Sequence, residues 1–135
     1  MKPKILVIED NEQNLYLTTF ILEKQGYEVI QAREGSEGVR LAGECEPDLI
    51  LLDIQLPEMD GYEVAHALRR NPTLDGVPIV AVTSYAMVGD RERVLAAGCT
   101  GYIEKPINPD TFVAQVEVHL PGNALDREGG SCLRF

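Results

Sequence analysis

The feature that most constrains the fold is an unbroken apolar run, Leu49 to Leu52, which ends on Asp53 and is followed by Pro57. Strands with one exposed face alternate apolar and polar residues, so a run without alternation is typical of a strand buried on both faces. Such strands occupy the middle of parallel sheets that are covered by helices. Folds of this kind bind ligands at the carboxyl ends of their strands, and Asp53 is therefore the first candidate for a functional residue.

The rest of the chain repeats this pattern of a short strand followed by a helix. Strands are predicted at residues 5–8, 27–30, 48–53, 77–82 and 101–103. Helices are predicted at about residues 11–25, 36–44, 62–70, 87–97 and 109–119. Five alternating pairs with short crossovers predict an α/β fold, a flavodoxin-like (βα)5 doubly wound parallel sheet with strand order 2-1-3-4-5.

Length and composition limit the class of protein. The chain of 135 residues fits one domain, predicted at residues 1–120, and the glycine-containing segment 121–135 is expected to be a flexible tail or the start of a linker. Lys and Arg number 12 against 22 for Asp and Glu, which gives a net charge of −10 and argues against direct DNA binding. The N-terminal apolar run is too short for a signal peptide or a membrane span, so we expect a cytoplasmic protein.

The three cysteines, Cys45, Cys99 and Cys132, are far apart and lack the spacing of metal ligands. Neither a disulfide framework nor a zinc site is indicated.

Polar residues follow four of the predicted strands. Glu9 and Asp10 follow the first, Asp53 ends the third, Thr83 follows the fourth, and Lys105 follows the fifth. In the predicted strand order these residues face one crevice, where three acids would repel each other unless a cation lay between them. Hard oxygen ligands suit Mg²⁺, so we infer a magnesium site. An aspartate beside such a metal can act as a nucleophile toward phosphorus, with Lys105 and Thr83 stabilising the phosphoryl oxygens.

Each of these residues also has a simpler interpretation. Asp10 with Gln13 could be a helix-capping pair, Thr83 a strand-end hydroxyl, and Lys105 a solvated cation. Other functions fit the sequence less well. The chain lacks the glycine-rich motif that a P-loop nucleotidase needs. In a flavin-binding protein, Glu9 and Asp10 would repel the phosphate of the flavin. An aspartate-nucleophile phosphatase and an interaction module that is never phosphorylated stay open.

Four motifs together resemble the receiver domain of bacterial two-component response regulators, over about residues 3 to 120. They are Ile8 to Asn11, Leu51 to Gly61, Val82 to Ala86, and Gly101 to Pro106. The resemblance implies that Asp53 accepts a phosphoryl group from a phosphohistidine of a sensor histidine kinase or a histidine phosphotransfer protein. It also implies a signalling protein, which catalyses only its own phosphorylation and slow dephosphorylation.

The same resemblance implies roles for the other site residues. Asp10 and Asp53 are implied to ligate Mg²⁺ with the Gln55 backbone carbonyl, and Glu9 to act nearby, often through water. Thr83 and Tyr102 match the switch pair of the family, and Lys105 matches its phosphate-contacting lysine, which precedes a cis proline.

The output is implied to reach a downstream protein partner through the fourth helix, fifth strand and fifth helix. The protein is then expected to be a monomer or a dimer that forms on phosphorylation.

Two positions depart from the family pattern or draw attention within it. Glu9 stands where many members have aspartate, which lengthens one arm of the acidic pair. Tyr85 is a bulky side chain beside the expected path of attacking water, and we hypothesise that it shields the aspartyl phosphate.

The first predicted helix carries more apolar residues than one inward stripe can hold. The inward stripe is predicted to be Leu17, Thr18, Ile21 and Leu22. The surplus, which suggests an exposed docking patch for a partner helix, consists of Leu15, Tyr16 and Phe20. Scattered surface apolar residues are also normal, so this interpretation has an ordinary alternative.

Overall fold

The structure is a computed structural model that describes residues 3–56, 60–83 and 88–120, without the side chains of residues 88–91. In it the described residues form a parallel five-stranded sheet in the order β2-β1-β3-β4-β5. The predicted flavodoxin-like (βα)5 fold and its strand order are therefore confirmed.

The strands are β1 Lys4–Ile8, β2 Glu28–Ala32, β3 Leu49–Asp53, β4 Ile79–Thr83 and β5 Gly101–Glu104. The helices are α1 Glu12–Lys24, α2 Gly35–Cys45, α3 Gly61–Arg69, α4 Val88–Ala96 and α5 Pro109–Glu117, with a short 3-10 helix at Pro72–Leu74.

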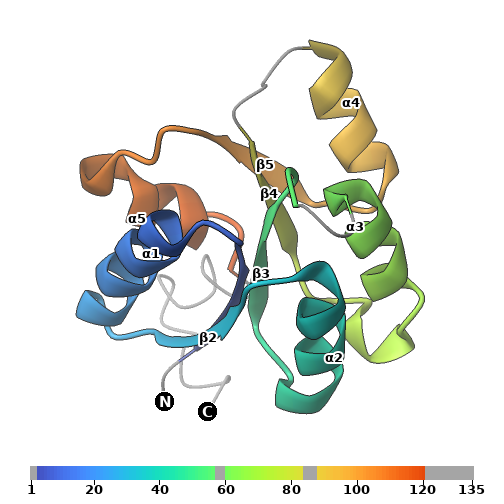
Figure 1. Cartoon of the computed structure of the whole chain (residues 1–135), viewed down its shortest axis with the longest axis horizontal. Coiled ribbons are helices and arrows are strands. Elements are labelled where there is room, and N and C mark those ends of the chain that lie inside the picture. Colours follow the sequence, from blue (N-terminus) through green and yellow to red (C-terminus); the bar gives the residue numbers. More distant parts are fainter. Residues whose placement is uncertain (1–2, 57–59, 84–87, 121–135) are drawn as a thin grey trace, which may run out of the picture.

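Helices cover both faces of the sheet (Figure 1). Helices α1 and α5 lie on one face, and α2, α3 and α4 lie on the other. Successive side chains of a strand point to opposite faces, so each central strand supplies both cores. In β3, for example, Leu49 and Leu51 belong to the α1/α5 core, whereas Ile50 and Leu52 belong to the core under α2 to α4. This double burial explains why the strand sequences do not alternate.

Strand β4 begins at Ile79, two residues later than the sequence suggested. Its position between β3 and β5 supplies the reason, because Pro78 has no N–H to donate to a neighbouring strand. The carbonyl of Pro78 still accepts from the Ile50 N–H at 3.0 Å. The strand therefore starts directly after Pro78, which cannot donate a backbone hydrogen bond.

Helix α1 corrects part of the predicted inward stripe. Its buried residues are Leu15, Thr18, Ile21 and Leu22, while Leu17 is only half-buried. Leu15 is 1% exposed and packs in the α1/α5 core, so its assignment to an exposed docking patch is wrong. The reason is helical spacing, since positions 15, 18 and 22 lie on one face.

No helix in the described part of the chain is long and apolar enough to cross a membrane. The proposed tail, residues 121–135, lies outside the described residues, and the boundary at residue 120 stays a prediction.

Candidate functional site

The sheet brings the candidate acids to one edge through its register. Ile8 of β1 pairs with Leu52 of β3, so the residues that follow, Glu9 and Asp53, are level with each other. The Glu9 N–H donates to the Ala32 carbonyl at 2.9 Å, which continues the pairing of β1 with β2 by one residue. Asp53 in turn pairs with Val82 of β4. The backbone pairing of the strands therefore fixes the positions of the Cα atoms from which the Glu9 and Asp53 side chains extend.

Glu9, Asp10 and Asp53 form a cluster in which one carboxylate oxygen of each lies within 4.8 Å of the others. Glu9 and Asp53 are buried, with 4% and 3% of their surfaces exposed, whereas Asp10 is exposed. Asp10 does not cap α1, because the Asn14 N–H donates to the side chain of Asn11 instead. The capping interpretation of Asp10 is thus wrong, and its carboxylate lies with the two buried ones.

Lys105 reaches this cluster from the end of β5. Its Nζ lies 3.4 Å from Oε1 of Glu9 and 3.5 Å from Oδ2 of Asp53. The Lys105 N–H donates to the Thr83 carbonyl at 2.8 Å, which holds the backbone of this segment against β4. The Lys105–Pro106 peptide bond is cis, as the resemblance implied.

Backbone N–H groups complete the environment of the two buried acids. The Asn11 N–H donates to Oε2 of Glu9 at 3.1 Å, and the Gln55 N–H donates to Oδ1 of Asp53 at 3.0 Å. Burial, followed by the nearby Asp53 carboxylate, raises the pKa of Glu9 to about 7, against the lowering effect of Asn11 and Lys105. The raised pKa means that a negative charge on Glu9 is unfavourable in this buried position beside Asp53.

This donor set fits a divalent metal. Three carboxylates converge, two of them are buried, and the pKa of Glu9 is raised by its burial and by the nearby Asp53 carboxylate. Lys105 brings one positive charge to Glu9 and Asp53, which is less than the charge of the three acids. An all-oxygen set with one exposed member suits Mg²⁺, which keeps several waters and uses few carboxylates.

Thr83 and Tyr102 come from the neighbouring strands β4 and β5, on the face of the sheet that α2, α3 and α4 cover. Thr83 lies two residues after Ala81 of the α2–α4 core and so shares its face of the strand, and Tyr102 packs against that same core. Thr83 is 3% exposed, and Tyr102 is half-buried on the edge strand β5. Both side chains therefore belong to the face that α4 covers.

The loop after β3 is tightened by Gly61. Its N–H donates to the Ile54 carbonyl at 2.9 Å, and a Cβ at this position would lie 2.5 Å from the Ile54 Cα. A glycine is thus needed where α3 begins. Residues 57–59 and Tyr85, with its proposed shielding role, lie outside the described residues.

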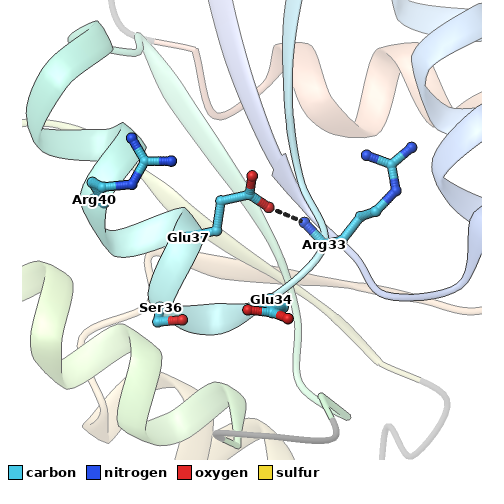
Figure 2. Close-up of a pocket in the computed structure, with 5 residues that line it drawn as sticks. All are labelled: Arg33, Glu34, Ser36, Glu37 and Arg40. Atoms are coloured by element: carbon cyan, nitrogen blue, oxygen red, sulfur yellow. Dashed lines mark hydrogen bonds between the residues drawn. The ribbon is translucent and has the colours of Figure 1, made fainter.

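A larger hollow, of about 530 Å³, lies away from this cluster at the start of α2 (Figure 2). It is lined by Arg33, Glu34, Ser36, Glu37 and Arg40. Its charges are largely balanced, because Arg33 pairs with Glu12, Arg40 pairs with Glu44, and Glu37 accepts from the Arg33 N–H. We therefore treat it as a solvated surface and not as a candidate site.

Sequence reasoning missed two kinds of contribution to the acidic cluster. The N–H groups of Asn11 and Gln55 are backbone donors, and no residue type signals them. Thr18 was predicted only as an inward residue of the first helix, yet it lines a small cavity with Glu9 and Asp53. The sequence feature that could have indicated this position is the hydroxyl of Thr18 on an otherwise apolar stripe of the helix.

Comparison with known families gives a direct match. The model of the response regulator receiver domain matches residues 5–117. The chain belongs to this family. Receivers are signalling phosphoacceptors in two-component systems, so the resemblance seen in the motifs is confirmed.

Individual relatives agree with the family. The chain is 44% identical over 120 residues to the polar-differentiation response regulator DivK of Brucella ovis, covering 89% of this chain and 98% of that protein. Among solved structures, the chemotaxis protein CheY4 of Vibrio cholerae matches with a TM-score of 0.86 and 28% identity, covering 89% of this chain and 100% of that one.

The receiver domain of the sensor histidine kinase PA1611 of Pseudomonas aeruginosa PAO1 was solved with a magnesium ion coordinated in its active site cleft. It matches with a TM-score of 0.81 and 34% identity over 88% of this chain and 98% of that one.

Proposed function

We propose that this receiver accepts a phosphoryl group on Asp53 from a partner phosphohistidine, in a reaction that depends on Mg²⁺. The observation that carries the proposal is the convergence of Glu9, Asp10 and Asp53, with Lys105 3.5 Å from the Asp53 carboxylate. The magnesium ion in the related PA1611 receiver supports the choice of metal.

Asp10 and Asp53 would hold the ion with the Gln55 backbone carbonyl, and Glu9 would hold it directly or through water. When bound, Mg²⁺ supplies positive charge for the phosphoryl oxygens. The remaining contributions come from the chain itself. Lys105 offsets charge that builds up on the transferred group, and the Gln55 N–H fixes the rotation of the Asp53 carboxylate.

The transfer step is a displacement at phosphorus. An oxygen of Asp53 forms the new P–O bond as the P–N bond to the donor imidazole breaks, and the bonding electrons leave with the imidazole nitrogen, which then takes up a proton. Asp53 is poised for this role because its backbone is fixed in β3 while its carboxylate lies at the sheet edge. Slow hydrolysis of the aspartyl phosphate would reset the protein.

The signal would then leave through Thr83 and Tyr102. A phosphoryl group on Asp53 adds acceptor oxygens, toward which the Thr83 hydroxyl can donate. Tyr102 would follow into the space that Thr83 leaves, because both side chains lie on the face covered by α4. We propose that this remodels the surface of α4, β5 and α5, to which a downstream protein binds, with the receiver acting as a monomer or as a dimer formed on phosphorylation.

We also propose that the kinase or phosphotransfer protein docks on α1. Tyr16 and Phe20 are 71% and 53% exposed, and their rings stack with centroids 6.3 Å apart. A pair of exposed stacked rings one helical turn apart suits the apolar face of a partner helix. Replacing both with alanine should slow transfer from the partner phosphohistidine while leaving phosphorylation by acetyl phosphate unchanged. Equal rates from the partner would remove α1 as the docking surface.

The main test is incubation with acetyl phosphate and Mg²⁺, followed by intact-mass measurement of the wild-type chain and the Asp53→Asn variant. The wild type should gain one phosphoryl group, and neither Asp53→Asn nor wild type in EDTA should do so. A wild type that gains no phosphate contradicts the proposal and favours a receiver that works as an interaction module without phosphorylation. Steady turnover of a generic phosphomonoester would instead indicate a phosphatase.

A further inference from the structure

A small cavity lies beneath the acidic cluster, on the side of the sheet covered by α1 and α5. Its polar walls are Thr18, Glu9 and Asp53, and most of its other walls are apolar side chains, among them Leu51 and Phe112. About 10 Å³ is open to water in this cavity, which is room for one molecule and too little for any larger ligand.

Strand alternation explains why the two acids reach this cavity. Glu9 lies two residues after Val7, and Asp53 lies two residues after Leu51, so each acid shares the face of its apolar predecessor. Val7 and Leu51 belong to the core under α1 and α5. The carboxylates thus lie at the upper margin of that core.

Thr18 faces the same space from α1. It is 3% exposed and sits between Leu15 and Leu22 on the buried stripe of the helix. Within the described residues, no side chain or backbone group makes a hydrogen bond to its hydroxyl. Buried hydroxyl groups in folded proteins are nearly always hydrogen-bonded, because an unpaired one loses its hydrogen bonds to water without gaining others.

The cavity supplies what that hydroxyl lacks. A buried water typically makes two to four hydrogen bonds to polar groups that have no other partner, and apolar cavities without such groups stay dry. Here a hydroxyl and two carboxylates border a space of the size of one water.

We propose that this cavity holds one ordered water, which joins the Thr18 hydroxyl to a carboxylate oxygen of Glu9 or Asp53. Thr18 is then a positioning residue for the phosphorylation site. Through the water it orients a buried carboxylate from the protein interior, while Lys105 contacts both acids from the end of β5. The role in phosphorylation rests on the proposed function, whereas the bound water does not.

Two substitutions separate the hydroxyl from the shape of the side chain. Thr18→Val keeps the volume and removes the hydroxyl, and Thr18→Ser keeps the hydroxyl and removes a methyl group. A high-resolution crystal structure of the metal-free wild type should show a water within hydrogen-bonding distance of Thr18 Oγ1 and one of the two carboxylates. The structure of Thr18→Val should lack it.

The functional readout is Mg²⁺ affinity measured by titration calorimetry, together with the rate of acetyl phosphate labelling at saturating Mg²⁺. Groups that orient metal ligands from behind typically change metal affinity by about tenfold when removed, so Thr18→Val should weaken Mg²⁺ binding by about that factor. Thr18→Ser should bind within about twofold of wild type, by the same principle.

Three results would overturn the proposal. The cavity could be dry in the wild-type crystal, the Thr18 hydroxyl could donate to the Asn14 carbonyl of its own helix, or Thr18→Val could bind Mg²⁺ as tightly as wild type. A wild type that binds no Mg²⁺ and gains no phosphate would contradict the proposed function instead, and the crystal would still decide whether the water is present.

Discussion

Glu9 and Asp53 show how the proposed phosphorylation site works against the stability of the domain that carries it. Both are buried, and the pKa of Glu9 is raised first by this burial and then by the neighbouring Asp53 carboxylate. Lys105 contacts both acids and offsets part of that cost. Functional clusters of this kind are commonly stabilised by substitutions that remove their activity.

We therefore expect Asp53→Asn to raise the free energy of unfolding of the metal-free protein by about 1 kcal/mol. The amide removes the repulsion with Glu9 and leaves Lys105 paired with it. Urea unfolding in EDTA measures the change, with Asp75→Asn at an exposed position as the control. A destabilised Asp53→Asn would show that the Lys105 contact outweighs the repulsion.

His119, which lies outside the acidic cluster, should make the stability of the fold depend on pH. Its ring lies against Gly101, where a Cβ would come within 2.5 Å of the imidazole, and burial lowers the pKa of His119 below its ordinary 6.5. A lowered pKa means that the fold prefers the neutral ring. The stabilising contribution is complete above about pH 6.5 and is lost as the pH falls through the folded-state pKa.

Between pH 7.5 and 5.5 the wild type should consequently lose more stability than His119→Gln, which cannot be protonated. Urea unfolding of both proteins at several pH values checks this. Parallel curves would mean that His119 is protonated as readily in the folded chain as in the unfolded one.

Among the helices, Arg69 joins α3 to the turn that follows α4. Its Nε donates to the Gly98 carbonyl at 2.9 Å, and its Nη1 donates to the Leu74 carbonyl at 2.7 Å. Arg93 of α4 also lies over the Tyr62 ring of α3, 4.2 Å from its centroid. Helix α4 and the turn after it are thus held against α3 by these two arginines.

Arg69→Met should lower the free energy of unfolding by about 2 kcal/mol, because two charged hydrogen bonds are lost while the apolar stem remains. The neighbouring Arg70 is exposed, so Arg70→Met is a matched control with little expected effect. Chemical denaturation measures both. Equal stabilities of the two variants would show that the Arg69 contacts are not stabilising.

Mg²⁺ should stabilise the entire fold by binding its native state. At a hundredfold excess over the dissociation constant, the gain is about 2.7 kcal/mol. The melting temperature of wild type should rise with Mg²⁺, and that of Asp53→Asn should rise much less. If the melting temperature of the wild type does not change with Mg²⁺, the three acids do not form a metal site.

The sequence predicted this architecture well because its determinants are local. The apolar runs of β1, β3 and β4 identify buried strands, and their order follows from short right-handed crossovers. The acids could be placed together for the same reason, since residues that end parallel strands share an edge. The packing of helices against the sheet was harder to predict from the sequence. The burial of Leu15 depends on how α1 rotates against the sheet, and Thr18 gained significance only through the cavity it faces.

The pairing of Ile8 with Leu52 has a consequence for how this protein can vary. Because side chains alternate along a strand, removing or inserting one residue within β3 would turn the Asp53 carboxylate to the face of α3 and α4, away from Glu9. Point substitutions cannot produce that displacement. The spacing of the strand is therefore as strict a requirement as the aspartate itself, and the loops at the opposite edge of the sheet are where changes in length can be tolerated.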